Sequence, residues 1–71
     1  MKATIRKDLM ESNQGIPVID IRNDSEMYIY GDKQYESYQP TVLDNNEYNT
    51  ILSTDDGDLF LSSSIDLDFI L

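Results

Sequence analysis

The chain contains no cysteine and no histidine. Disulfides, cysteine redox chemistry, zinc fingers and every histidine-dependent catalytic triad are therefore excluded. A domain of 71 residues buries only about 60% of the surface that its unfolded chain exposes, so its stability is marginal. Small domains without disulfides or metals commonly gain stability by oligomerising, most often as homodimers. We therefore expect residues 1–71 to form a single acidic domain that pairs with a second copy.

Long apolar runs are also missing. The longest unbroken one is MYIY, residues 27–30, whereas a membrane-spanning helix needs about 20 apolar residues. The N-terminal segment MKATIRKDLM has basic residues but lacks the apolar core of a signal peptide. These absences predict a protein that acts in the cytoplasm and does not enter a membrane.

Basic residues are scarce, and the second half of the sequence has none. The chain holds 14 Asp and Glu against 5 Lys and Arg, which gives a net charge of −9. Residues 1–10 are net positive, whereas residues 35–71 hold acids and no base. Such a field repels nucleic acid and attracts basic proteins. Solubility is the simpler explanation of the same acidity.

Apolar and polar residues alternate in several short segments, as strands require. The sequence predicts strands over residues 3–10, 16–22, 27–30 and 34–39, and an apolar C-terminal stretch over residues 59–71 that SSS interrupts. Turn residues between the first two segments predict that they form a hairpin. In the last segment one face holds Ile65, Leu67, Phe69 and Leu71, and the other holds Asp66 and Asp68.

One segment has a helical pattern. Asp44 followed by Glu47 resembles a capping box, and Tyr48, Ile51 and Leu52 follow at helical spacing. We therefore predict a short helix over residues 44–53, with a strand over residues 48–52 as the alternative. The predicted fold is α+β, a small antiparallel sheet with one short helix.

The C-terminal strand supplies the expected dimer interface. It ends in three consecutive apolar residues, Phe69, Ile70 and Leu71. An apolar strand at the edge of a sheet exposes unpaired backbone groups and invites pairing with another chain. We therefore expect these three residues to form the contact between two copies.

No pattern indicates an enzyme, a metal site or a cofactor. Fourteen acids create carboxylate pairs by chance, and so small a chain lacks the deep pocket that would shift their pKa values. The segment DDGD resembles part of a calcium-binding EF-hand loop. With Gly57 at the sixth loop position, however, Leu52 and Ser63 occupy positions that require Asp and Glu. A calcium-responsive domain is the most remote alternative.

The spacing of the acids suggests a function. Aspartates at positions i and i+2 of a strand, such as Asp66 and Asp68, lie about 6.6 Å apart, close to two phosphate steps of about 3.4 Å along one DNA strand. Carboxylates held in this way can bind the Lys and Arg side chains that would otherwise grip phosphates. The candidate partner-binding acids come from four segments: Asp55, Asp56, Asp58, Asp66, Asp68, Glu36, Asp44 and Glu47.

In length, lack of cysteine, acidity, β-rich pattern and patterned acidic surface, the chain resembles the small acidic proteins with which bacteriophages inhibit host DNA-binding proteins by mimicking DNA. The resemblance covers residues 20–71 and includes no diagnostic motif, so no site residue is taken from it. Proteins of this class block uracil-DNA glycosylase, restriction enzymes, CRISPR nucleases or the nucleoid protein HU; the HU inhibitor of a Bacillus phage is similar in size.

The resemblance implies a non-enzymatic inhibitor in the cytoplasm of a host cell, which binds the DNA-binding groove of a basic protein and not nucleic acid itself. HU is the first candidate target, because a wide basic saddle suits a broad acidic dimer, and uracil-DNA glycosylase is the second. From a different class, the alternative is an acidic interaction or assembly module whose charge serves solubility.

Overall fold

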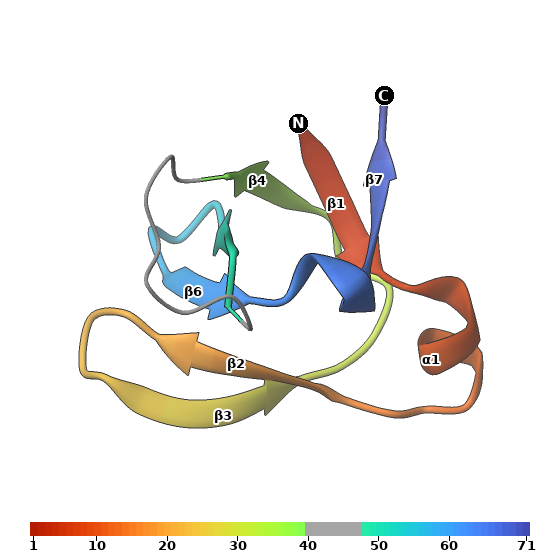
Figure 1. Ribbon diagram of the computed structural model, residues 1–71, viewed down its shortest axis with the longest axis horizontal. Coiled ribbons are helices and arrows are strands. Elements are labelled where there is room, and N and C mark those ends of the chain that lie inside the picture. Colours follow the sequence, from red (N-terminus) through yellow and green to blue (C-terminus); the bar gives the residue numbers. More distant parts are fainter. Residues whose placement is uncertain (40–47) are drawn as a thin grey trace.

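The computed structural model describes residues 1–39 and 48–71 (Figure 1). Within them lie seven short strands, one α-helix and one 3-10 helix. In chain order the elements are β1 (Lys2–Ile5), α1 (Lys7–Glu11), β2 (Ile16–Asp20), β3 (Ser25–Ile29), β4 (Tyr35–Tyr38), β5 (Thr50–Ser53), β6 (Leu59–Ser62), the 3-10 helix η1 (Ser64–Asp66) and β7 (Leu67–Ile70). The expected small antiparallel sheet with one short helix is confirmed, although the helix lies elsewhere in the chain.

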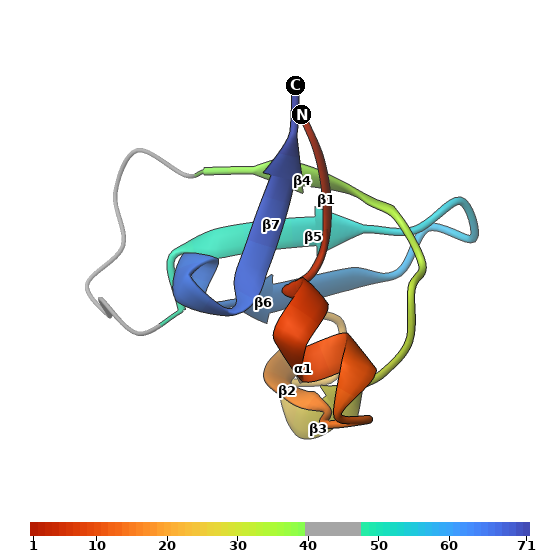
Figure 2. The same ribbon diagram turned by 90° about the vertical axis from the view of Figure 1, so that its right-hand side faces the viewer.

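All the described strands belong to one antiparallel sheet, in the order β3-β2-β6-β5-β4-β1-β7. Strand β1 lies between β4 and β7, so the first and last strands of the chain run side by side (Figure 1). Strands β3 and β7 form the two edges. The sheet bends strongly, and in Figure 2 strand β7 runs across β5 and β6 rather than along them. One face of the sheet therefore encloses a small core.

The core is built from alternate residues of the strands, because successive side chains of a strand point to opposite faces. On β1, Ala3 and Ile5 are buried and Lys2 is exposed; on β5, Leu52 is buried and Ile51 half-buried. Full burial of a side chain such as Leu52 stabilises the fold by about 1.5–3 kcal/mol. The buried apolar residues are Ala3, Ile5, Ile16, Val18, Ile29, Tyr35, Leu52, Phe60 and Leu67.

The predicted helix over residues 44–53 is wrong in its second half. Residues 50–53 form β5, in which Thr50 and Leu52 are buried on the same face. The alternative strand over residues 48–52 is the better match. The capping-box residues of the prediction, in the segment 44–47, lie outside the described residues.

The strand predicted over residues 3–10 ends at Ile5, and α1 follows it. Leu9 and Met10 of α1 both pack against the core. A strand would send these consecutive side chains to opposite faces, so a helix is the local structure that satisfies both. The predicted hairpin of the first two segments is also wrong: β1 pairs with β4 and β7, whereas β2 pairs with β3 and β6.

The predicted C-terminal strand over residues 65–71 is shorter than expected. Its first residues belong to η1, and β7 begins at Leu67. Ile65 is 74% exposed and Leu67 is 6% exposed, so these two side chains do not share a face. The predicted alternation holds within β7 itself.

Candidate functional site

Two turns lie next to each other at one end of the sheet. Strand β2 pairs with β3 on one side and with β6 on the other, where Asp20 lies opposite Ser25 and Phe60 respectively. The β2–β3 turn, residues 21–24, and the β5–β6 turn, residues 54–58, therefore leave the sheet at the same end. Acids from two distant parts of the sequence meet there.

Two contacts join these turns. The backbone N–H of Ile21 donates to the carbonyl oxygen of Leu59 at 3.0 Å. The Arg22 guanidinium forms an ion pair with the carboxylate of Asp58, with 3.3 Å between Nη1 and Oδ1. The relative position of the two turns is therefore fixed by backbone and side-chain contacts.

The β5–β6 turn is held by internal hydrogen bonds. Thr54 N–H donates to the Asp58 carbonyl at 3.1 Å, Gly57 N–H donates to the Thr54 carbonyl at 3.0 Å, and Asp58 N–H donates to Thr54 Oγ1 at 3.1 Å. Gly57 has a φ of +87°, a left-handed conformation that glycine adopts without strain. This compact turn holds the exposed Asp55 and Asp56 at its tip.

We name this region the twin-turn acidic end. Five carboxylates and one guanidinium give it a net charge of −4: Asp20, Asp24, Asp55, Asp56, Asp58 and Arg22. Three of these acids belong to the surface that the sequence predicted, whereas Asp20 and Asp24 do not. Both flank the β2–β3 turn, which is the signal in the sequence, but only the pairing of β2 with β6 shows that they lie beside the β5–β6 turn.

Glu36, another of the predicted acids, has basic neighbours. Glu36 on β4 lies opposite Lys2 on β1. Its carboxylate is 3.6 Å from the N-terminal amine of Met1 and 3.6 Å from Lys2 Nζ. Glu36 therefore joins β4 to the start of the chain.

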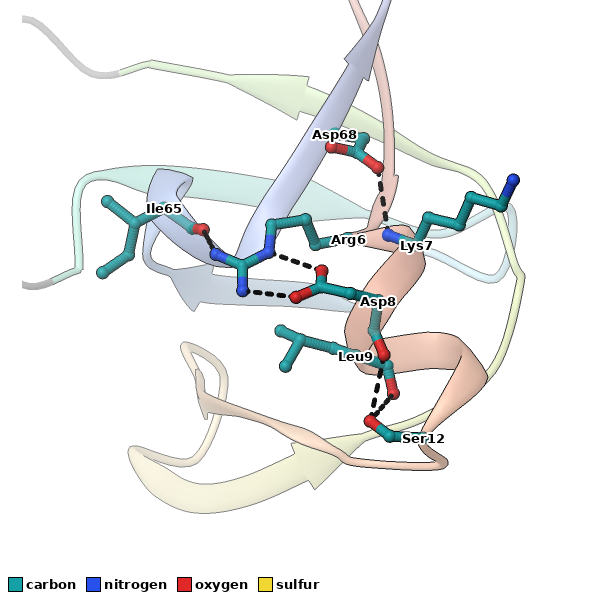
Figure 3. A network of polar contacts seen from close by, with 7 residues as sticks. All are labelled: Arg6, Lys7, Asp8, Leu9, Ser12, Ile65 and Asp68. Carbon is teal, nitrogen blue, oxygen red and sulfur yellow. Dashed lines mark hydrogen bonds and ion pairs between the residues drawn. The ribbon is translucent and has the colours of Figure 1, made fainter.

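Asp68 is also in contact with the first part of the chain (Figure 3). Its Oδ2 accepts a hydrogen bond of 3.1 Å from the backbone N–H of Lys7, at the start of α1. Beside it, Arg6 Nη1 donates to the Ile65 carbonyl oxygen at 3.0 Å, and Arg6 N–H donates to the Asp66 carbonyl oxygen at 2.9 Å. These contacts attach β7 and η1 to the junction between β1 and α1.

Arg6 is the centre of this cluster (Figure 3). Its guanidinium binds the Asp8 carboxylate at two points, with Nε–Oδ1 2.7 Å and Nη2–Oδ2 2.8 Å. These hydrogen bonds lower the pKa of Asp8 and raise the pKa of Arg6, and the charges of Asp66 and Asp68 raise the pKa of Arg6 further. We name this second region the terminal corner. Its charged groups are Lys2, Arg6, Lys7, Asp8, Glu36, Asp66, Asp68 and the N-terminal amine.

The structure thus separates the predicted acids into groups. Asp55, Asp56 and Asp58 lie in the twin-turn acidic end, Glu36, Asp66 and Asp68 lie in the terminal corner, and Asp44 and Glu47 lie outside the described residues. Asp66 belongs to η1, so the strand spacing of about 6.6 Å does not apply to Asp66 and Asp68. The base-free half of the sequence is partly neutralised in space by bases of the first half.

The predicted dimer contact lies on an edge strand. Phe69 is half-buried, Ile70 is 41% exposed and Leu71 is completely exposed. Phe69 and Leu71 line a hollow of about 500 Å³ together with Met1, Ser37 and Gln39. Among the described residues no further strand pairs with the outer edge of β7, so this edge is open to a second chain.

Across residues 1–39 and 48–71 no three Asp or Glu side chains gather closely enough to hold a metal ion. The same residues contain no helix that is long and apolar enough to cross a membrane.

No protein-family model, curated protein or solved structure matches this chain. Function is therefore inferred from the geometry of the chain itself.

Proposed function

We propose that this protein is a non-enzymatic inhibitor that mimics DNA and occupies the DNA-binding groove of a basic protein. The twin-turn acidic end carries this proposal. Its carboxylates lie on two adjoining turns fixed by hydrogen bonds and by the Arg22–Asp58 ion pair. A basic groove that receives this end would pair its Lys and Arg side chains with carboxylates in place of phosphates.

The spacing of the turns supports this reading. Strands β2 and β6 are neighbours in the sheet, about 4.8 Å apart, so the charges of the two turns lie beside each other at one end of the sheet. They therefore act on an approaching partner as one negative field, which raises the rate of association with a basic groove. Asp55 and Asp56 are exposed, and neither has an ion pair within residues 1–39 and 48–71 that a partner would have to break.

The terminal corner has a different role in this proposal. Its acids already accept hydrogen bonds or face bases of the same chain, as Glu36 and Asp68 do. An acid paired in this way gives up an internal contact when it binds a partner. We therefore assign partner binding to the twin-turn acidic end and attachment of the two chain ends to the terminal corner.

The target class is a DNA-binding protein of a host cell, met in its cytoplasm. HU is the first candidate and uracil-DNA glycosylase is the second. The active form is a homodimer in which the residues at the end of β7, Phe69, Ile70 and Leu71, make the contact. A dimer would present two twin-turn acidic ends to a wide basic saddle.

A competition experiment tests the proposal. Purified HU or uracil-DNA glycosylase is bound to a fluorescent duplex, and the protein is added at low and moderate salt. The wild-type chain should displace the duplex, and displacement should weaken as salt rises because exposed charges are screened. Failure to displace DNA from either target would leave the acidic assembly module as the better account.

Two variants with equal charge locate the binding surface. The twin-turn variant carries Asp24→Asn, Asp55→Asn and Asp56→Asn, and the corner variant carries Glu36→Gln, Asp66→Asn and Asp68→Asn. Because removing one partner of a charge pair in an interface weakens binding, the twin-turn variant should lose about tenfold or more in affinity for the basic target and the corner variant much less. Equal losses would mean that net charge, and not this end of the sheet, determines binding.

A further inference from the structure

Strand β7 has a free edge whose hydrogen-bonding groups can be assigned. The Ser37 N–H donates to the Met1 carbonyl oxygen, and the Arg6 N–H donates to the Asp66 carbonyl oxygen. In an antiparallel ladder the backbone groups of successive residues point to alternate sides. Lys2 and Thr4 therefore bond to Ile70 and Asp68 across the β1–β7 ladder.

The same alternation shows which groups of β7 remain open. The backbone groups of Leu67, Phe69 and Leu71 point away from β1, toward the side where the described residues supply no further strand. The N–H of Leu67 already donates to the carbonyl oxygen of Ser64, the first residue of η1. The open edge thus offers the carbonyl of Leu67 and both groups of Phe69, followed by the N–H of Leu71.

We propose that two copies of the chain pair antiparallel through β7, in a ladder centred on Phe69. Phe69 then exchanges both backbone hydrogen bonds with the partner's Phe69. Leu71 N–H donates to the carbonyl oxygen of the partner's Leu67, and symmetry repeats this bond. The inference specifies the homodimer of the proposed function and does not depend on the identity of the basic target.

Symmetry limits the possible registers. A two-fold axis perpendicular to the sheet places inward-facing residues of one copy opposite inward-facing residues of the other. Because side chains alternate along a strand, the axis must then pass beside a single residue, on which the ladder is centred. A centre at Asp68 would place two carboxylates directly opposite each other, which is destabilising. A centre at Ile70 would overlap only residues 69–71, whereas a centre at Phe69 overlaps all of β7.

Charge favours the same centre. On the outward face, Glu36, Lys2 and Ile70 lie in one row across β4, β1 and β7. A centre at Phe69 places the partner's Asp68 next to Ile70 in this row. Lys2 then lies two strands from that carboxylate. Asp68 in turn lies beside an apolar residue and not beside another acid.

The other edge of the sheet is less suited to pairing. Strand β3 carries Glu26 and adjoins the twin-turn acidic end, so a second copy bound there would meet an acidic neighbourhood. At β7 the completely exposed Leu71 would face the partner's Leu67. Pairing through β7 also leaves both twin-turn acidic ends away from the ladder.

Cysteine cross-linking tests the register, because the chain has no cysteine of its own. Asp68→Cys and Ile70→Cys variants, one of them tagged, are oxidised separately and as a mixture. In the proposed ladder these positions face each other with about 4.5 Å between Cα atoms, within disulfide range, whereas two identical positions are about 8 Å apart. The mixture should therefore give cross-linked heterodimers several-fold more than either variant alone gives homodimers.

Each other result overturns the proposal. Self-cross-linking of Asp68→Cys or of Ile70→Cys would place the centre at that residue. Self-cross-linking of the control Tyr28→Cys would assign the contact to β3. Absence of cross-links in every sample would exclude pairing through β7.

Sedimentation gives a second test that needs no cysteine. The wild-type chain should sediment with twice the chain mass. Leu71→Asp should sediment as a folded single chain, because Leu71 is completely exposed within one copy but faces the partner's Leu67. A monomeric wild type, or a dimeric Leu71→Asp variant, would overturn the pairing; a monomer that still displaces DNA would leave the basic target in place.

Discussion

The terminal corner and the twin-turn acidic end are both rich in acids, but their acids differ in what surrounds them. In the terminal corner, Asp8 is held by Arg6 at two points and Asp68 accepts a backbone N–H at the start of α1. In the twin-turn acidic end, Asp58 has an ion pair with Arg22, and Asp55 and Asp56 are exposed at the tip of a turn with internal hydrogen bonds. The first region uses its acids to attach parts of the chain to one another, and the second presents Asp55 and Asp56 to the surroundings.

This difference shows that pairing in space determines the role of an acid. Along the sequence, residues 35–71 hold eight acids and no base. The fold brings Lys2 of β1, and Arg6 directly after β1, to the strands that carry Glu36 and Asp68. The bases near the N-terminus therefore neutralise one part of the acidic half and leave the other part charged.

Both regions depend on one core, so a core substitution should have the largest effect on stability. It should disrupt the terminal corner and the twin-turn acidic end together. Leu52 is 0% exposed, and Leu52→Ala should lower the free energy of unfolding by about 2–5 kcal/mol through lost burial and a cavity. For so small a domain this leaves much of the chain unfolded. Urea unfolding followed by circular dichroism measures the change.

A surface substitution provides the control for this prediction. Ile65 is 74% exposed, so Ile65→Ala should change the free energy of unfolding by no more than about 0.5 kcal/mol. If Leu52→Ala were as stable as Ile65→Ala, the enclosed face of the sheet would not be the core.

A smaller effect should appear in the pH dependence of the terminal corner. Hydrogen bonds from Arg6 hold the pKa of Asp8 below its ordinary value of 3.8. A carboxylate with a lowered pKa contributes stability that is fully present above its ordinary pKa and is lost as the pH falls through the lowered value. The Asp8→Asn variant lacks this contribution at every pH.

The urea midpoints of wild type and Asp8→Asn should therefore differ by a constant amount at neutral pH. The difference should close as the pH falls below about 4, because the wild-type carboxylate becomes protonated. A difference that stays the same down to the lowest pH would mean that the Arg6–Asp8 contact does not stabilise the folded state.

Much of the local structure could be predicted from the sequence. The strands near residues 16–22, 27–30 and 34–39 and the turn at Asp55 and Asp56 follow from period-two alternation and turn residues, which act over a few positions. The pairing of the strands could not be predicted, because β1 pairs with β4 and β7 through contacts between residues far apart in sequence.

The position of the helix and the neighbours of the acids could not be predicted for the same reason. Helix α1 begins where Asp68, 61 residues away, accepts the N–H of Lys7, and no local pattern around Lys7 reveals that partner. The acids were predicted to form one surface because the sequence shows where bases are absent along the chain. It does not show that Arg22 and Lys2 approach Asp58 and Glu36 in the fold.

The stability of the two charge-matched variants tests the central claim most directly. Each of the triple variants of the twin-turn acidic end and the terminal corner removes three negative charges, so their net charges are equal. The free energy of unfolding of each variant is measured with urea at low salt and at one protein concentration. Relative to wild type, the two variants should change this free energy in opposite directions. The twin-turn variant should be more stable than wild type because repulsion is relieved. The corner variant should be less stable by about 1 kcal/mol or less, because Glu36 loses its charge contacts with Met1 and Lys2 and Arg6 loses the charges of Asp66 and Asp68. Equal shifts in the same direction would contradict the account, since net charge alone would then explain both regions.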